Sequence, residues 1–190
     1  KMSEFQNYNG PIIDVWANWW DNNFFKQYPR LRELYERLGI EGRMKLSSEN
    51  LVQEAKKAKI TKIILSATVC DEAQVSNAKV YETAKKASNL ISPCASVDPR
   101  NGMESIRQLR YAVNDLGCIA VKFLPFLYGL PPNHASFFPL YAECVELNVP
   151  ALILTGHTAV NLSNETGRPG SLDDIALYFP ELVIVAGHAG

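Results

Sequence analysis

The sequence has few of the residues that usually carry chemistry, and several common motifs are missing. Three of its 190 residues are histidine and four are cysteine. Cys70, Cys94, Cys118 and Cys144 are too widely spaced for a CxxC pair, which argues against a zinc knuckle or a redox dithiol. We expect the last three to be small buried hydrophobes in a reducing compartment. Neither GxGxxG nor a P-loop occurs, so nothing favours a nucleotide-binding fold.

Long hydrophobic runs and an excess of either charge are also missing. No apolar run approaches the roughly 18 residues of a membrane span, and the start of the chain has no apolar secretion signal. The net charge of −1 gives no basic field for nucleic acid or an anionic membrane. We therefore expect a single cytoplasmic domain over residues 1–190, acting on a small-molecule substrate, with no nucleic acid and no membrane as partner.

Short apolar runs alternate with helical patterns along the whole chain. Continuous runs of this kind are typical of strands buried on both faces of a parallel sheet. Their alternation with helices leaves two α/β architectures open, an open doubly wound sheet or a barrel. A closed eight-stranded barrel needs about 250 residues, so a barrel here would comprise the first six βα units, its C-terminal part missing. Strands are expected at 11–17, 62–67, 91–97, 119–124, 151–155 and 183–186, and helices at 48–58 (capped by Ser48), 71–87, 106–116, 137–145 and 171–179 (capped by Ser171).

Two of the apolar runs end in Gly-His, at His157 and at His188. Polar groups at the carboxyl ends of parallel strands line the functional face of α/β proteins. Both histidines are therefore candidate general acids or bases, with loop capping and a plain rim position as the alternatives. His134 lies in another strand-to-helix loop, so we expect it at the same rim.

Charged residues inside or beside the predicted strands are further candidates. Lys122 could hold a substrate carboxylate or act with a lowered pKa, or it could form a buried pair with Asp14. Asp14 is equally a structural or a catalytic candidate. Arg168 follows the fifth strand and could clamp a carboxylate, the alternative being a solvated loop arginine.

The segment 16–43 is a long first loop rich in aromatic residues. Trp16 and Trp19 are candidates for the wall of a substrate pocket, with Asn18 between them. The alternative is a packed insertion that covers a barrel mouth, and the two interpretations are compatible.

Several segments together resemble the amidohydrolase-related TIM-barrel family, which includes aminocarboxymuconate-semialdehyde decarboxylase and the resorcylate-type decarboxylases. They are Ile12-Ile-Asp14, Gly117-Cys-Ile-Ala-Val-Lys-Phe123, the run 138–150, Glu165-Thr-Gly-Arg-Pro169 and the run 179–188. The resemblance implies a TIM-type (β/α)8 barrel. It also implies hydrolysis or non-oxidative decarboxylation of a small carboxylated cyclic or aromatic compound, and a homodimer or larger homo-oligomer.

The resemblance further implies a divalent metal, zinc or manganese. Its ligands would be a His-x-His after strand one, a histidine on strand five and an Asp on strand eight, with the strand-six histidine as ligand or partner. Here these positions carry Trp16, Asn18 and Leu154, and His188 alone matches. Tryptophan cannot ligate, and an amide oxygen is a weak zinc ligand. Two hypotheses follow: an enzyme in which His188 holds a metal or acts with His157 as an acid–base pair, or a degenerate member serving as a binding or scaffold protein.

Overall fold

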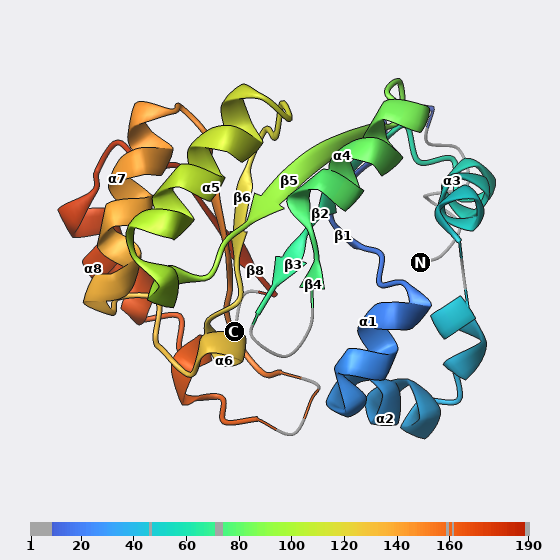
Figure 1. Ribbon diagram of the computed structural model, residues 1–190, viewed down its shortest axis with the longest axis horizontal. Coiled ribbons are helices and arrows are strands. Elements are labelled where there is room, and N and C mark those ends of the chain that lie inside the picture. The colour runs from blue at the N-terminus through green and yellow to red at the C-terminus, as the bar shows by residue number, and fades with distance from the viewer. Residues whose placement is uncertain (1–8, 46, 71–73, 159, 161, 189–190) are drawn as a thin grey trace.

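The computed structural model describes residues 9–188 except 46, 71–73, 159 and 161. Six parallel strands form one curled sheet, and all six were predicted from the sequence (Figure 1). Their order along the sheet is β1 (Ile13–Asn18), β2 (Lys62–Ser66), β5 (Ile91–Ser96), β6 (Val121–Phe123), β7 (Ala151–Leu154) and β8 (Ile184–Gly187).

The strand order distinguishes between the two predicted architectures. Each strand of the sheet pairs with the next one along the chain, always in parallel. A doubly wound sheet reverses its order at a switch point, which places helices on both faces. Here right-handed crossovers in one direction place every crossover helix on the same, convex face. The fold is therefore that of a TIM-type barrel, of which these six strands form a part.

The crossover helices cover the outer side of this sheet, and the short helices of residues 22–37 and 125–128 lie toward the carboxyl ends of the strands (Figure 1). Helices α5 and α7 pack on each other, and α4 packs on β5. The helices are α1 (Asn22–Gln27), α2 (Pro29–Arg37), α3 (Ser48–Lys57), α4 (Asn77–Lys86), α5 (Met103–Asn114), α6 (Pro125–Tyr128), α7 (Phe138–Glu146) and α8 (Ser171–Tyr178), with 3-10 turns η2 (Glu41–Lys45), η3 (Pro99–Asn101), η4 (Ala135–Phe137) and η5 (Glu165–Gly167). No helix of the described part of the chain is long and apolar enough to cross a membrane.

Two predicted helix caps and one predicted helix start were wrong. Helix α3 is capped by Ser47, which forms a capping box with Asn50, and not by Ser48. Helix α4 begins at Asn77, because Gln74–Val75 form strand β4 of a small antiparallel hairpin with β3 (Thr68–Val69); residues 71–73 of the predicted helix lie outside the described residues. In α8, Ser171 is the first helical residue, and its N-cap makes no side-chain hydrogen bond.

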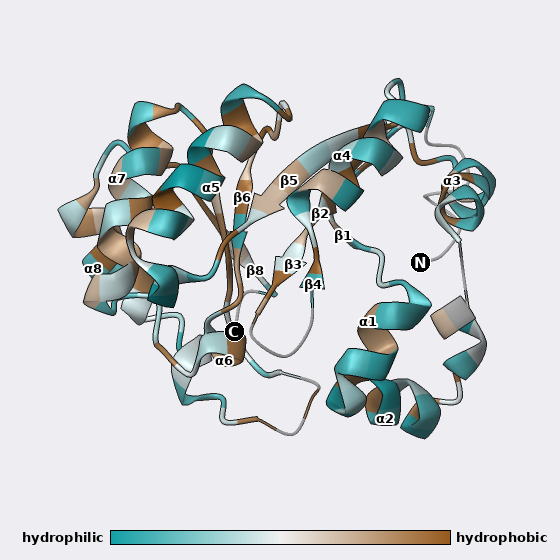
Figure 2. Ribbon diagram, in the orientation of Figure 1, coloured by the Kyte–Doolittle hydropathy of each residue, from teal (hydrophilic) through white to brown (hydrophobic). Residues whose placement is uncertain are grey.

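The two faces of the sheet bury different kinds of residue. The convex face packs against helices through large, fully buried side chains such as Phe123 and Leu65, and Phe123 meets Tyr141 of α7 edge-on. Figure 2 shows the hydrophobic residues along β6 and the hydrophilic residues on α2 and α3. The concave face carries a smaller cluster, in which Cys94, Ala120 and Leu152 are buried and Trp16, Ile64 and Val185 pack against them.

The aromatic first loop is a folded insertion of two helices. Asp21 caps α1 by accepting from the Phe24 amide at 2.9 Å, and a proline starts α2. Phe24, Phe25 and Tyr28 are buried, and the Trp20 ring stacks on Phe24 with 5.8 Å between centroids. The insertion is thus packed, as one of the two interpretations predicted, and some of its rings also line a cavity described next.

Candidate active site

A cavity of about 350 Å³ lies at the carboxyl ends of the strands. It brings together four of the predicted site residues, Trp16, Asn18, His157 and His188. Nearly all other lining side chains are apolar, and they come from the aromatic insertion, from α6 and from the end of β7. They include Trp20, Phe24, Leu31, Leu124, Phe126, Leu127 and Leu154. A concave, mostly apolar surface with a few convergent polar groups is typical of a small-molecule site.

Buried hydrogen bonds hold the two histidine-bearing strand ends together. Thr155 follows β7 and is 0 % exposed. Its amide and its hydroxyl both donate to the Gly187 carbonyl oxygen, at 3.0 and 2.8 Å. Gly187 precedes His188, and Thr155 lies two residues before His157. This pair of hydrogen bonds therefore fixes the separation of the two histidine backbones.

His157 is held in a defined tautomer by its own loop. Its Nδ1 lies 2.7 Å from the Thr158 carbonyl oxygen. A carbonyl only accepts, so Nδ1 must carry the hydrogen, and in the neutral ring Nε2 keeps its lone pair. The loop itself is braced by Asn164, whose Oδ1 accepts from the Thr158 amide at 2.9 Å. His157 therefore offers Nε2 as a base at the edge of the cavity.

The packing around the His188 ring depends on a close contact between Trp16 and Gly187. The Trp16 ring meets the His188 ring edge-on, with 5.6 Å between centroids. A Cβ at Gly187 would lie 2.5 Å from Trp16 Cη2, so only glycine lets the tryptophan pack here. His188 itself has a φ of 66°, in the left-handed region that is unfavourable for a side chain of this kind. Strain of this sort is maintained by surrounding structure and is found most often at functional sites.

Lys122 lies behind the cavity and is completely buried. Its Nζ donates to Asn18 Oδ1 at 2.5 Å. Burial lowers the pKa of Lys122 to about 8. Burial also raises the pKa of Cys94 to about 11, so this neighbour is a neutral thiol. Lys122 does not line the cavity itself and reaches it through Asn18.

The predicted pair between Asp14 and Lys122 does not form. Asp14 accepts a hydrogen bond from the Trp16 amide at 3.0 Å instead. The reason is an irregularity in β1. Asp14 pairs with Ile63 and Ala17 with Leu65, so two residues of β1 lie opposite one residue of β2 between these pairs. This irregularity places Asp14 beside Ile63, whose side chain packs in the helix-facing core, whereas Lys122 meets Asn18 on the concave face.

Three other predicted residues lie outside the cavity. Arg168 is exposed and pairs with Glu165 at 2.8 Å. Trp19 lines a neighbouring hollow together with Asn18, under the Lys79 ammonium. His134 caps η4 by accepting from a backbone amide at 3.2 Å. Substrate contacts by Arg168 and Trp19 remain predictions that this geometry does not favour.

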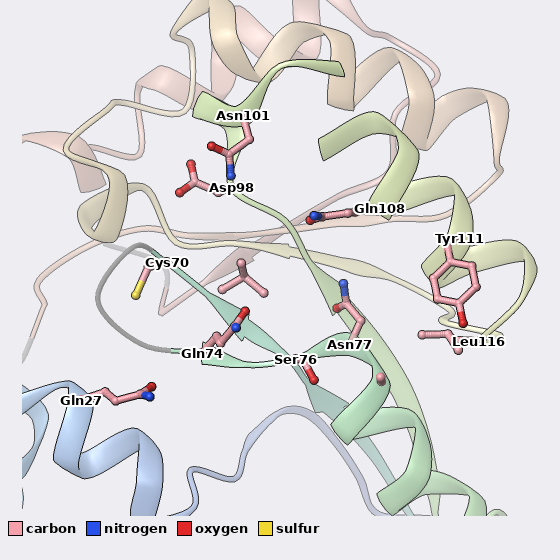
Figure 3. A pocket seen from close by; sticks show the side chains of 12 residues that line it. Gln27, Cys70, Gln74, Ser76, Asn77, Asp98, Asn101, Gln108, Tyr111 and Leu116 are labelled. Atoms are coloured by element: carbon pink, nitrogen blue, oxygen red, sulfur yellow. The ribbon is translucent and has the colours of Figure 1, made fainter. Parts of the chain in front are cut away.

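A larger and more polar hollow lies elsewhere, between the β3–β4 hairpin, the start of α4 and α5 (Figure 3). Its volume is about 510 Å³, and amide side chains surround it, including Gln74, Asn77, Asn101 and Gln108. Asn77 is already used structurally, since it exchanges two hydrogen bonds with the Ser96 backbone. None of the predicted site residues lines this hollow, so the cavity at the strand ends is the better candidate.

The residues at the strand ends do not fit the divalent ion that the family resemblance implies. Within the described part of the chain, no three His, Cys, Asp or Glu side chains come close enough to hold a metal. Asn18 Oδ1, the one oxygen donor at an expected ligand position, accepts from the Lys122 ammonium. A cation-bonded amide oxygen beside a tryptophan and a leucine is a poor ligand set, because such sites need three or four donors in fixed geometry.

Sequence reasoning missed residues that build the site without carrying an obvious chemical group. Thr155 carries no group that suggests catalysis, yet it joins β7 to β8. Phe126 and Leu127 belong to the short helix α6, which was not predicted from the sequence. A proline directly after the predicted strand was the available signal, because proline favours the first turn of a helix.

Comparison with known proteins places the fold in a family. Residues 13–190 match the amidohydrolase family, and no protein of curated function matches the chain. An uncharacterised TIM-barrel protein from Bordetella bronchiseptica has a TM-score of 0.74 and 23% identity, over 93% of this chain and 66% of its own. The 5-carboxyvanillate decarboxylase from Sphingomonas paucimobilis has a TM-score of 0.73 and 13% identity, over 94% of this chain and 67% of its own.

A 5-carboxyvanillate decarboxylase from Novosphingobium aromaticivorans, solved with bound manganese, has a TM-score of 0.70 and 15% identity, over 95% of this chain and 66% of its own. At such identities the structural likeness establishes the fold alone. The chain spans about two thirds of the length of these proteins. Given the family match over residues 13–190, the chain belongs to the amidohydrolase family.

Proposed function

We propose that this protein is an enzyme that acts on a small aromatic carboxylic acid, with non-oxidative decarboxylation as its reaction. The observation that carries the proposal is the meeting of His157 and His188 at one apolar cavity. Its volume of about 350 Å³ suits a single substituted ring, and aromatic walls such as Trp20 and Phe24 suit its faces. Decarboxylases among the solved structures of similar fold support the reaction class.

The site residues divide the work as an acid–base pair. His188, as imidazolium, gives a proton to the ring carbon that bears the carboxylate; the bond to the carboxylate breaks, carbon dioxide leaves, and the ring regains its aromatic electrons. His157 accepts a hydrogen bond from a ring hydroxyl through Nε2, the nitrogen that its Thr158 contact leaves unprotonated. Water returns the proton to His188. The apolar wall around the ring suits the departing carbon dioxide, which needs little hydration.

The test is turnover of hydroxylated benzoates in deuterated water by the full-length protein. The product should carry one deuterium at the position that the carboxylate vacated. His188→Ala and His157→Ala should each lower kcat by about 100-fold or more, as expected for a general acid or base. His134→Ala is the matched control, since this histidine only caps η4. Activity of His188→Ala within a few-fold of wild type would exclude the assignment.

Metal content belongs to the same experiment. Protein purified without chelator should contain well under one zinc or manganese per chain by plasma mass spectrometry. About one ion per chain would mean that donors beyond the described residues complete a metal site around His188. The acid–base pair would then be replaced by a metal-assisted step.

A binding or scaffold role is the second candidate, and Trp16 and Leu154 favour it. At expected ligand positions they add apolar wall and no chemistry. This role predicts that aromatic acids bind without any turnover, and that His188→Ala changes the affinity no more than His157→Ala does. Deuterium incorporation into any product would exclude it.

A further inference from the structure

The concave face of the sheet encloses a cation for which the described residues supply no anion. Lys122 is 0 % exposed, and its Nζ contacts Asn18 Oδ1 at 2.5 Å. Within the part of the chain that the structure describes, no carboxylate lies at ion-pairing distance from it. Buried charges are normally paired, because an isolated charge in an apolar interior is strongly unfavourable. The neutral amide oxygen of Asn18 accepts from one of the three N–H donors of Lys122, and it does not neutralise the positive charge of the ammonium.

The remaining polar neighbours are neutral as well. Ser66 is paired in register with Asn18 on one side and with Cys94 on the other. Its hydroxyl is buried and has no hydrogen bond of sound geometry, since the adjacent thiol is a weak partner. Buried polar groups without partners are uncommon in native proteins and call for an explanation. Here they lie in one layer, directly behind the cavity.

The orientation of the Asn18 amide is determined by chemistry. A lysine ammonium has donors only, so the atom of Asn18 that faces Nζ must be the oxygen. The opposite end, Nδ2, then carries two N–H donors, and they make no hydrogen bond to the described residues. Asn18 lines the same cavity as His157 and His188. The Asn18 amide therefore borders the cavity in which the substrate would bind, with the Lys122 ammonium immediately behind it.

We propose that Asn18 and Lys122 form an anion-binding site that receives the carboxylate of the substrate. Asn18 contacts the ligand, donating from Nδ2 to a carboxylate oxygen. Lys122 is a positioning residue: it fixes the amide orientation and supplies positive charge through it. The inference rests on the proposed function for the identity of the ligand. It also explains how a chain with Trp16, Asn18 and Leu154 at its expected ligand positions keeps a positive charge at this point of the barrel.

The experiment compares benzoate with benzamide, which has nearly the same shape and no charge. Dissociation constants are measured by calorimetry at pH 7 for the full-length wild type, Lys122→Met and Asn18→Asp. Methionine keeps the length of the side chain without its charge. In Asn18→Asp the new carboxylate pairs with Lys122 and offers no N–H donor, so the size is retained and the electrostatics are reversed. Circular dichroism and unfolding curves verify that each variant folds.

Wild type should bind benzoate more tightly than benzamide. Both variants should weaken benzoate binding by about 10-fold to 100-fold, the usual effect of a hydrogen bond to a charged group, and benzamide binding by less than about 2-fold. Equal losses for both ligands would overturn the proposal, because they would indicate a purely structural role, and so would unchanged benzoate binding. If charge discrimination depends on Lys122 while no aromatic acid is turned over, the anion site stands and the proposed enzyme fails. If an aromatic acid is turned over but charge discrimination does not depend on Lys122, the proposed enzyme stands and the anion site fails.

Discussion

Replacing Lys122 by methionine should stabilise the protein at neutral pH, and the gain should shrink as the pH rises. Methionine fills nearly the same space and has no charge to bury. Burial lowers the pKa of Lys122 from 10.5 to about 8. With about 1.4 kcal/mol for each pKa unit, this difference means that burying the charged form costs the wild type roughly 3 kcal/mol.

The sign of the pH dependence follows from proton binding in the two states. Below pH 8 the Lys122 ammonium is charged in the folded and the unfolded protein, so the wild type carries the whole cost. Between pH 8 and 10.5 the folded protein gives up this proton first. The unfolded state then binds more protons, and wild-type stability rises with pH relative to the variant. The advantage of Lys122→Met should therefore fall by roughly 3 kcal/mol between pH 7 and pH 10.5.

Urea unfolding followed by circular dichroism, at a series of pH values, measures this difference. Burial raises the pKa of Cys94 to about 11 and of Cys118 and Cys144 to about 12, so both proteins lose stability above pH 9 as unfolded thiols ionise. Subtracting the wild-type curve from the Lys122→Met curve removes this common loss. Lys62→Met, at an exposed strand position, is the control. An advantage that stays constant within about 0.5 kcal/mol over this range would refute the argument.

Three further predictions follow, two on glycine packing at the strand ends and one on the accessibility of the thiols. Gly187→Ala should cost about 1–3 kcal/mol in the free energy of unfolding, because its Cβ meets Trp16 at 2.5 Å; Trp16→Leu should remove most of that cost in a double-mutant cycle. Gly167→Ala should destabilise the His157 loop and lower kcat, since its Cβ would lie 2.5 Å from the Gly156 carbonyl oxygen, which cannot move independently; thermal unfolding and turnover both report it. In the native protein at pH 8, an aromatic disulfide reagent should modify at most Cys70, and the three buried thiols should react only in denaturant.

The strands were predictable because burial on both faces leaves a strong mark in the sequence. The runs Ala151–Leu154 and Ile184–Gly187 contain no polar or charged side chain, and Thr155 and His188 directly follow them. The β3–β4 hairpin was not predictable, because strands of two residues carry no periodic signal. The missing reversal of strand order also has no local signal, so the residue pattern alone left barrel and open sheet as alternatives.

The meeting of the two histidines could be predicted from the sequence, whereas the hydrogen-bond partner of Lys122 could not. His157 and His188 end two strands of one parallel sheet, so topology alone brings them to the same rim. The partner of Lys122 depended on the irregularity in β1. With strict alternation Asp14 and Asn18 would share a face, being four residues apart. One additional residue between Asp14 and Ala17 turns the carboxylate toward the helices and leaves the amide inside.

Two of the residues at the expected metal-ligand positions contact complementary residues on other strands. Trp16 packs on Gly187 and on the edge of His188, and Asn18 accepts from Lys122. Each of these replacements thus has a partner that fits it, on a strand far away in sequence. Loss of function without compensation would leave ligand positions filled at random, with no reason for a buried lysine to persist behind a neutral amide. The matched pairs instead favour a site with positive charge on Lys122 behind the cavity and His188 at its rim.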